Sequence, residues 1–236
     1  MGQAGLCAPG PGPGGHGRLT AMPSAIRQTS PAAERNKGPI VDALLQLLPA
    51  QGRLLEIAAG TGQHAVHGAA RLPGWTWQPT DPDAAALSSI AAWAARQPAR
   101  GLRPPLRLDV MADPWPAGIE PDGATVPPWD AVFCANLLHI APWDCCAALM
   151  RGAARVLAPR GQLITYGPYL IEGEPSAPSN LAFDADLKAR NPAWGLRWLH
   201  AVVAEAEAAG LALAQRQPMP ANNQLLVFRR AGPPRP

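Results

Sequence analysis

The sequence has no stretch that is long and apolar enough to cross a membrane, although 47% of its 236 residues are hydrophobic. A membrane-spanning helix needs about 18 or more consecutive apolar residues, and every apolar run here is shorter. The amino-terminal residues also lack the apolar core of a secretory signal. We therefore expect a soluble protein with no membrane partner, whose hydrophobic residues form an internal core.

Charge is sparse and nearly balanced, with 20 Lys and Arg against 17 Asp and Glu. The arginines are scattered along the chain and form no basic stripe. Proteins that follow a phosphate backbone usually gather their positive charge on one surface. The sequence therefore predicts no nucleic-acid partner.

Cysteine is also scarce, and the four residues present, Cys7, Cys134, Cys145 and Cys146, show no C-x-x-C spacing. The observed positions of the cysteines argue against both the usual zinc arrangement and a disulfide framework. His64 and His67 stand three residues apart, but no carboxylate or cysteine follows at a spacing that would complete a metal site. We expect no metal, reduced thiols and a cytoplasmic location.

Glycine and proline dominate the first 21 residues, which cannot bury enough apolar surface to offset the entropy of ordering. Met22 follows this tract and is a candidate for the native start. The domain prediction is a disordered Gly/Pro-rich extension over 1–29, one folded domain over 30–230 and a disordered tail over 231–236.

Strand and helix patterns alternate within the folded domain. Apolar residues at helical spacing between Ile40 and Leu48 predict a first helix, with Pro39 in its first turn. The patterns that follow predict strands at 53–58, 75–79, 105–109, 130–135, 161–166, 211–217 and 224–229, and helices at 63–72, 83–96, 143–157 and 196–209. This order predicts an α/β fold, a mainly parallel sheet covered by helices on both faces.

A glycine-rich loop, Ala58-Ala59-Gly60-Thr61-Gly62, connects the first strand to the next helix. Glycines let the backbone approach a ligand closely, and the helix start supplies free N–H groups. The spacing Gly60-x-Gly62-x-x-Ala65 also satisfies the dinucleotide-binding pattern, so a nicotinamide-dependent oxidoreductase is one hypothesis.

Three acidic residues end successive strands and favour another ligand. Glu56 lies four residues before Gly60, where a carboxylate repels a pyrophosphate and attracts a cationic ammonium. Asp81 is placed to bind ribose hydroxyls, and Asp109 to bind an adenine amine. The alternatives are that Asp81 caps the next helix and that Asp109 begins a turn. The three together predict a site for S-adenosylmethionine.

With these motifs the sequence resembles the class I S-adenosylmethionine-dependent methyltransferases, and more closely the family of methyltransferase-like protein 26. The closer likeness rests on the segments 30–37, 60–64, 165–169, 191–197 and 219–223. The resemblance implies a Rossmann-like seven-stranded sheet with an antiparallel last strand, and donor contacts at Glu56, Gly60, Asp81 and Asp109. It implies no particular methyl acceptor.

The acceptor is expected where strands end above the donor. His139 is a candidate base or a packing residue, and Tyr166 and Tyr169 are candidates to orient the acceptor. The segments 35–37 and 219–223 are predicted to meet over one pocket, with Asn222 and Asn223 either binding ligand or shaping a turn. Arg190 and Arg197 either bind an anionic acceptor or pair with Asp184 and Asp186, and the loop 171–180 is expected to form a lid.

The leading functional hypothesis is a methyltransferase for a small molecule, supported by the lack of a basic stripe and of an Asn-Pro-Pro-Tyr motif. A non-catalytic S-adenosylmethionine-binding module that acts through a protein partner is the second. The residues expected to bind the donor are Arg35, Asn36, Glu56, Ala58, Gly60, Gly62, His64, Asp81, Asp109, Val110 and Asn136, and those expected to act on the acceptor are His139, Tyr166, Tyr169, Asn222 and Asn223.

Overall fold

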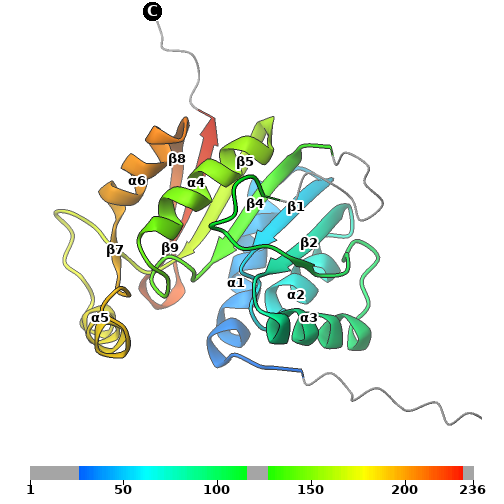
Figure 1. Ribbon diagram of the computed structural model, residues 1–236, viewed down its shortest axis with the longest axis horizontal. Helices are drawn as coiled ribbons and strands as arrows, with labels where there is room; N and C mark the ends of the chain where they lie inside the picture. The colour runs from blue at the N-terminus through cyan, green and yellow to red at the C-terminus, as the bar shows by residue number, and fades with distance from the viewer. Residues whose placement is uncertain (1–26, 116–126, 231–236) are drawn as a thin grey trace, which may run out of the picture.

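The computed structural model describes residues 27–115 and 127–230 as a sheet between two layers of helices (Figure 1). The predicted extension and tail therefore lie outside the described residues, except for 27–29. Those three residues are part of the fold, because the Gln28 backbone bonds Ser89 and Trp93 and the Arg27 guanidinium lies over the Trp93 ring. The described structure begins at Arg27, three residues before the predicted boundary.

The central sheet has seven strands in the order β3-β2-β1-β4-β5-β9-β8. They are β1 Gly52–Ile57, β2 Trp75–Asp81, β3 Leu106–Arg107, β4 Trp129–Ala135, β5 Leu157–Gly167, β8 Leu211–Met219 and β9 Asn223–Arg230. β9 runs antiparallel to both of its neighbours, β5 and β8, whereas the pairs from β3 to β5 are all parallel. The predicted mainly parallel sheet with an antiparallel last strand is confirmed, although β3 is shorter than the predicted strand.

Helices cover both faces of this sheet, as predicted (Figure 1). One face carries α1 Pro31–Leu47, α2 Gln63–Arg71 and α3 Ala84–Arg96, and the other carries α4 Asp144–Val156 and α6 Leu199–Ala208. Side chains alternate along each strand, so Leu54 packs towards α1 and α2 while Leu55 and Ile57 pack towards α4. The molecule thus has two hydrophobic layers, one on each face.

Helix α1 begins eight residues earlier than Pro39, the position predicted for its first turn. The Ser30 hydroxyl accepts a hydrogen bond from the backbone N–H of Ala33, and Pro31 occupies the first turn. Pro39 lies inside the helix instead. The prediction was wrong because a serine cap followed by proline is a stronger start signal than an internal proline.

Helix α5, Pro178–Arg190, was not predicted. It includes only residues 178–180 of the segment expected to form a lid, and it lies beside the carboxyl ends of β4 and β5 (Figure 1). A two-stranded parallel sheet, β6 Tyr169–Leu170 with β7 Arg197–Trp198, flanks it in the chain. Among the described residues no helix is long and apolar enough to span a membrane.

Candidate functional site

The glycine loop adopts backbone angles that few residue types tolerate. Ala58, Gly60 and Gly62 have φ of 55°, 56° and 89°, in the left-handed region. A Cβ on Gly62 would lie 2.8 Å from the Ile90 Cα, so both backbone angle and packing require glycine there. At Gly60 the corresponding space is open. The loop therefore packs tightly against α3 at one end and presents bare backbone at the other.

Asp81 closes this loop onto the end of β2. Its carboxylate accepts hydrogen bonds from the backbone N–H of Gly60, at 2.9 Å, and of Asp83, at 3.0 Å. Burial raises the pKa of Asp81, and these two hydrogen bonds oppose the rise. The helix cap of α3 is Asp83, which bonds Ala85, so the alternative role for Asp81 as that cap is wrong.

Glu56 is buried in β1, the strand that leads into the loop. Its carboxyl group accepts a hydrogen bond of 2.7 Å from the Trp77 indole N–H. Burial raises the pKa of Glu56 to about 8, with a smaller contribution from the charge of Asp81. The side chain is thus uncharged at neutral pH unless a cation lies close to it. Trp77 was not singled out in the sequence, although its alternation along β2 places it on the face that Glu56 shares.

Asp109 follows β3 on the surface. Its carboxylate accepts from the Met111 backbone N–H at 2.9 Å, and its carbonyl accepts from Ala112 at 3.0 Å, which confirms that it begins a turn. The adjacent Val110 is buried, and its carbonyl accepts a hydrogen bond from the Trp115 indole. Asp109 is exposed, and its turn holds it at the same edge of the sheet as Asp81.

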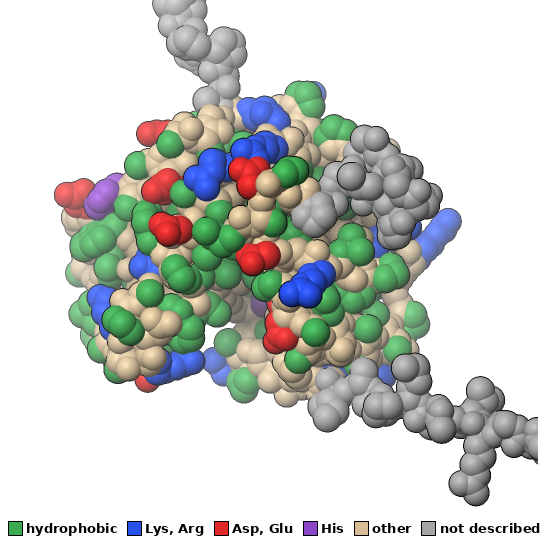
Figure 2. Space-filling model, viewed as in Figure 1, with side chains coloured by type: hydrophobic (Ala, Val, Ile, Leu, Met, Phe, Trp, Pro, Cys, Tyr) green, Lys and Arg blue, Asp and Glu red, His purple; other side chains and the backbone are tan. Residues whose placement is uncertain are grey.

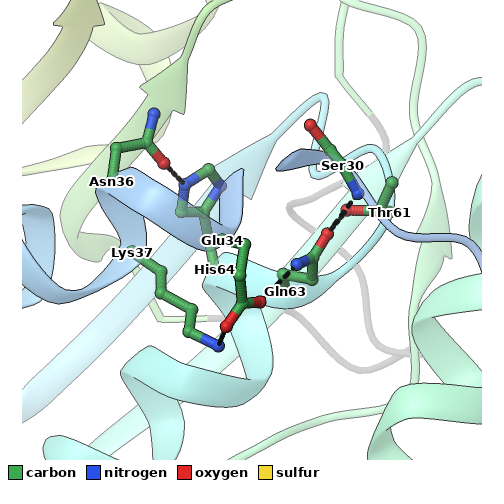
Figure 3. A network of polar contacts seen from close by, with 7 residues as sticks. All are labelled: Ser30, Glu34, Asn36, Lys37, Thr61, Gln63 and His64. Carbon is green, nitrogen blue, oxygen red and sulfur yellow. Dashed lines mark hydrogen bonds and ion pairs between the residues drawn. The ribbon is translucent and has the colours of Figure 1, made fainter. Parts of the chain in front are cut away.

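The start of α1 is bonded to the start of α2, just after the loop (Figure 3). Gln63 links them: its carbonyl oxygen accepts from the Ser30 backbone N–H, at 2.6 Å, and from the Thr61 hydroxyl, at 3.0 Å. Its amide donates to Glu34, which also pairs with Lys37. The sequence motifs at 30–37 and 60–64 are thus bonded to each other in the fold. The sequence did not reveal the bond between Gln63 and Glu34 that joins them.

His64 is buried and bonded to the same segment. Its Nε2 lies 2.7 Å from the Asn36 Oδ1 (Figure 3), and burial lowers its pKa to about 4. Burial raises the pKa of Tyr166, near the end of β5, and the nearby Asn36 side chain opposes that rise. Arg35, the neighbour of Asn36, is exposed.

His139 lies on the opposite side of the same edge, after β4. A Cβ on Gly167 would lie 3.4 Å from its Nδ1, and the Phe183 ring from α5 contacts it edge-on at 5.5 Å between centroids. Burial lowers the pKa of His139 to about 4, helped by the charge of Arg197. Asn136 is nearby, with φ of 61° and its backbone N–H bonded to the Tyr166 carbonyl.

Tyr169 does not join these residues. It is fully buried in the hydrophobic layer beside α4, and its hydroxyl bonds Thr165 at 2.9 Å. The expected role in orienting an acceptor therefore does not fit its position. Tyr166 and Tyr169 are three residues apart in an extended part of the chain, so their rings pack in the two opposite hydrophobic layers.

The segment 219–223 forms a turn that contacts α5. Asn222 has φ of 57°, its carbonyl accepts from Asn180 and its amide donates to Ser179. The Asn223 amide donates to the carbonyls of Pro220 and Ala221 within the turn. Within the described residues neither asparagine is hydrogen-bonded to segment 35–37, so the structure supports the turn-shaping alternative.

The two arginines expected near the acceptor are engaged elsewhere. Arg197 donates to the carbonyls of Leu138, Ala141 and Ala193 and so ties β7 to the loop of His139. Arg190 lies 3.6 Å from Asp186, the pairing that was expected as an alternative. Asp184 instead pairs with Lys188 and accepts from the Leu196 backbone.

A hollow lies in the surface of the molecule beside these elements. Figure 2 shows it between the part of the surface that carries α5 and the part that carries α2 and α3, with acidic side chains beside it. The glycine loop, Asp81 and Asp109 lie at the ends of β1, β2 and β3, and His139 and Tyr166 at the ends of β4 and β5. One crevice therefore runs along the carboxyl edge of the sheet.

Residues 27–230 match the model of a protein family described as a protein of unknown function, DUF938. The match covers nearly all of the described fold. The chain belongs to the DUF938 family. No activity is part of that description, so the family assignment leaves the reaction to be argued from the site.

Solved methyltransferase structures share the fold of this DUF938 protein. The mitomycin 7-O-methyltransferase MmcR matches with a TM-score of 0.69 and 19% identity, covering 85% of this chain and 54% of its own. An O-methyltransferase family 2 protein from Planctomyces limnophilus, in complex with apigenin, matches at 0.67 and 19%, covering 84% and 60%. CalO1, a methyltransferase in calicheamicin biosynthesis with bound S-adenosylhomocysteine, matches at 0.66 and 17%, covering 85% and 54%.

The chain thus spans little more than half the length of these three structures. At such low identity the matches show the fold, which is the Rossmann-like class I methyltransferase fold.

Proposed function

We propose that this protein is an S-adenosylmethionine-dependent methyltransferase that acts on a small molecule. The observation that carries the proposal is the hydrogen bond between the Asp81 carboxylate and the Gly60 backbone N–H. It joins the acidic end of β2 to a left-handed loop after β1, at the point where the strand order reverses between β1 and β4. An open parallel sheet binds its ligand at such a switch point.

The acidic residues favour a methyl donor over a nicotinamide dinucleotide. A bound pyrophosphate would lie against the loop directly above Glu56, whose ionisation its charge would oppose. A methionyl ammonium would instead favour the ionised carboxylate. Asp81 offers oxygens to ribose hydroxyls, and Asp109 offers an exposed carboxylate to an adenine amine, so each part of S-adenosylmethionine has a partner along the edge.

The donor supplies the reactive methyl group, and the protein aligns an acceptor with it. A lone pair on the acceptor attacks the methyl carbon, the carbon–sulfur bond breaks, and S-adenosylhomocysteine leaves with the bonding electrons. A hydroxyl acceptor also loses its proton. His139 is neutral at pH 7, so its ring can accept a hydrogen bond from that hydroxyl, but a pKa of about 4 makes it a weak base. We assign it to orienting the acceptor, with the proton passing to water.

The acceptor side of the crevice is partly apolar. Gly167 has no side chain to press on His139, and the exposed Phe183 ring on α5 contacts the other part of that histidine. One matched structure is a mitomycin 7-O-methyltransferase, and another is an O-methyltransferase family 2 protein in complex with apigenin. These features support a neutral small-molecule acceptor. The segments 30–37, 60–64, 165–169, 191–197 and 219–223 support a relationship to methyltransferase-like protein 26, and the buried free cysteines support a cytoplasmic setting.

Isothermal titration calorimetry with S-adenosylmethionine, S-adenosylhomocysteine and NADH tests the donor. We expect the first two to bind and NADH not to bind; the reverse would support the oxidoreductase. Incubation with labelled donor and a metabolite extract, followed by mass spectrometry, then tests turnover. A small product that gains one methyl group supports the enzyme, whereas donor binding with no labelled product from any extract would favour a binding module that acts through a protein partner.

A further inference from the structure

Thr61, in the middle of the glycine loop, is held by two side chains from different helices. Its hydroxyl donates a hydrogen bond of 3.0 Å to the Gln63 carbonyl oxygen at the start of α2 (Figure 3). Its backbone carbonyl accepts a hydrogen bond of 2.9 Å from the Ser89 hydroxyl of α3. Gln63 and Ser89 are both buried. The loop is therefore bonded through Thr61 to the two helices next to it.

Each of these two side chains also bonds the segment before α1, residues 27–30, which we call the strap. The Gln63 carbonyl oxygen accepts from the Ser30 backbone N–H at 2.6 Å (Figure 3). The Ser89 hydroxyl oxygen accepts from the Gln28 backbone N–H at 2.9 Å. An amide oxygen can accept twice, and a hydroxyl can donate and accept at once, so each side chain makes both of its bonds together. Two bridges thus connect the strap to the glycine loop.

The strap is largely exposed and has no regular secondary structure. Residues 27–29 lie at the surface, and none of the four belongs to a helix or strand. Besides the bridges, the Trp93 indole N–H donates to the Gln28 carbonyl at 2.8 Å. Segments that bury little apolar surface open locally at a lower free energy than the rest of a fold. We therefore expect the strap to detach more readily than the sheet and helices, and its detachment breaks both bridges.

The glycine loop depends on support of this kind because its backbone is strained. Ala58 has φ of 55°, in the left-handed region that residues other than glycine rarely adopt. Gly60, whose N–H bonds Asp81, directly precedes Thr61. The position of Thr61 therefore affects the Gly60 backbone at the centre of the proposed donor site.

We propose that the strap is a positioning element of the donor site. Through Gln63 and Ser89 it holds Thr61, and so the glycine loop, in the shape that binds the methyl donor. This inference rests on the proposed function and adds a coupling between donor binding and attachment of the strap. Such coupling is reciprocal. If detachment weakens donor binding by a given factor, the bound donor suppresses detachment by the same factor.

Hydrogen exchange of single backbone amides, measured by NMR with and without saturating S-adenosylhomocysteine, tests the coupling. We expect the ligand to slow exchange of the Gln28 and Ser30 N–H groups by about five-fold or more. Gly210 is the control amide, because its exposed residue bonds Glu207 at the opposite edge of the sheet. Its exchange should not change.

Ser89→Ala removes one bridge without altering the surface of the crevice, because Ser89 is fully buried. Ser88→Ala is the matched control, since the exposed Ser88 hydroxyl bonds Ala84 within the same helix. Ser89→Ala should bind S-adenosylhomocysteine about five-fold or more weakly in calorimetry, and the ligand should no longer slow exchange at Gln28. Ser88→Ala should match the wild type in both measurements.

Thermal melting of both variants reports folding, and the wild-type exchange experiment carries the test if Ser89→Ala is unfolded. Binding of S-adenosylhomocysteine to the wild type without slower exchange in the strap would overturn the inference and leave the proposed function intact. Wild-type affinity in folded Ser89→Ala would do the same. If the folded wild-type protein does not bind S-adenosylhomocysteine, the proposed function fails and the inference falls with it.

Discussion

Trp77 donates its indole N–H to the buried carboxyl group of Glu56 across 2.7 Å, beneath the glycine loop. The contact joins β1 to β2 and leaves Glu56 with a pKa of about 8. An acid of this kind holds its proton through the neutral range when no ligand is present. The stability of the unliganded protein should therefore depend on pH in a way that reports this residue.

We expect stability to be greatest near pH 6.5. Glu56 has a folded-state pKa above its ordinary value of 4.5, so the folded chain binds the extra proton and stability falls as pH rises from about 4.5 to 8. His64 and His139 have pKa values of about 4, below 6.5, so stability rises with pH up to about 6.5. Two histidines outweigh one glutamic acid where the ranges overlap.

Glu56→Gln should remove the fall in stability above pH 6.5, because glutamine matches the protonated acid in shape and still accepts from Trp77. Urea unfolding of wild type and variant at half-unit steps from pH 5 to 8.5 measures this. If the variant still loses stability between pH 6.5 and 8 as the wild type does, the raised pKa belongs to another group.

Asp81→Ala should weaken both the donor site and the fold. It leaves the backbone N–H groups of Gly60 and Asp83 without their acceptor, which costs about 1–3 kcal/mol of folding free energy. Donor affinity should fall by about ten-fold or more with the loss of the ribose partner. Chemical denaturation and calorimetry measure the two effects.

Asp83→Ala is the control, since the Asp83 side chain caps α3 and the variant keeps the backbone N–H that bonds Asp81. It should cost about 1 kcal/mol of stability and leave donor affinity unchanged. Equal losses of donor affinity in the two variants would show that general loosening of the region, and not Asp81 itself, matters for binding.

Gly62→Ala should destabilise the protein more than Gly60→Ala. Both replace glycine at positive φ, at a cost of about 1 kcal/mol or more. The Gly62 Cβ would also press on the Ile90 backbone, which cannot move aside as a flexible side chain does, whereas the space at Gly60 is open. Thermal melting should therefore rank wild type above Gly60→Ala above Gly62→Ala. A reversed order would mean that the loop is arranged differently.

Asn223→Ala should lower stability by about 1 kcal/mol, because its amide bonds two carbonyls of the turn before β9. Asn222→Gly should be nearly neutral, since glycine adopts the left-handed angle without strain. Methyl transfer should follow the folded fraction in both. Loss of turnover at full stability would instead restore the hypothesis that these asparagines bind the acceptor.

The periodicity of the sequence predicted most of the fold because long buried elements leave regular apolar patterns. Helix α5 was missed because only Leu187 among its residues is buried, so it has no apolar stripe. The loop and its acids were predictable since each lies at or near the carboxyl end of a strand. The hydrogen bond between Asn36 and His64 was not, because the two residues are 28 apart in the chain. The burial of Tyr169 was missed although it stands three residues from Tyr166, a spacing that turns the two rings to opposite faces of an extended chain.

The most direct test of the account is the affinity of the wild-type protein for S-adenosylhomocysteine, measured by calorimetry beside Asp81→Ala and the capping control Asp83→Ala. The account predicts binding at one site per chain, a loss of about ten-fold or more in Asp81→Ala and wild-type affinity in Asp83→Ala. No binding to the folded wild-type protein, or wild-type affinity in Asp81→Ala, would contradict it.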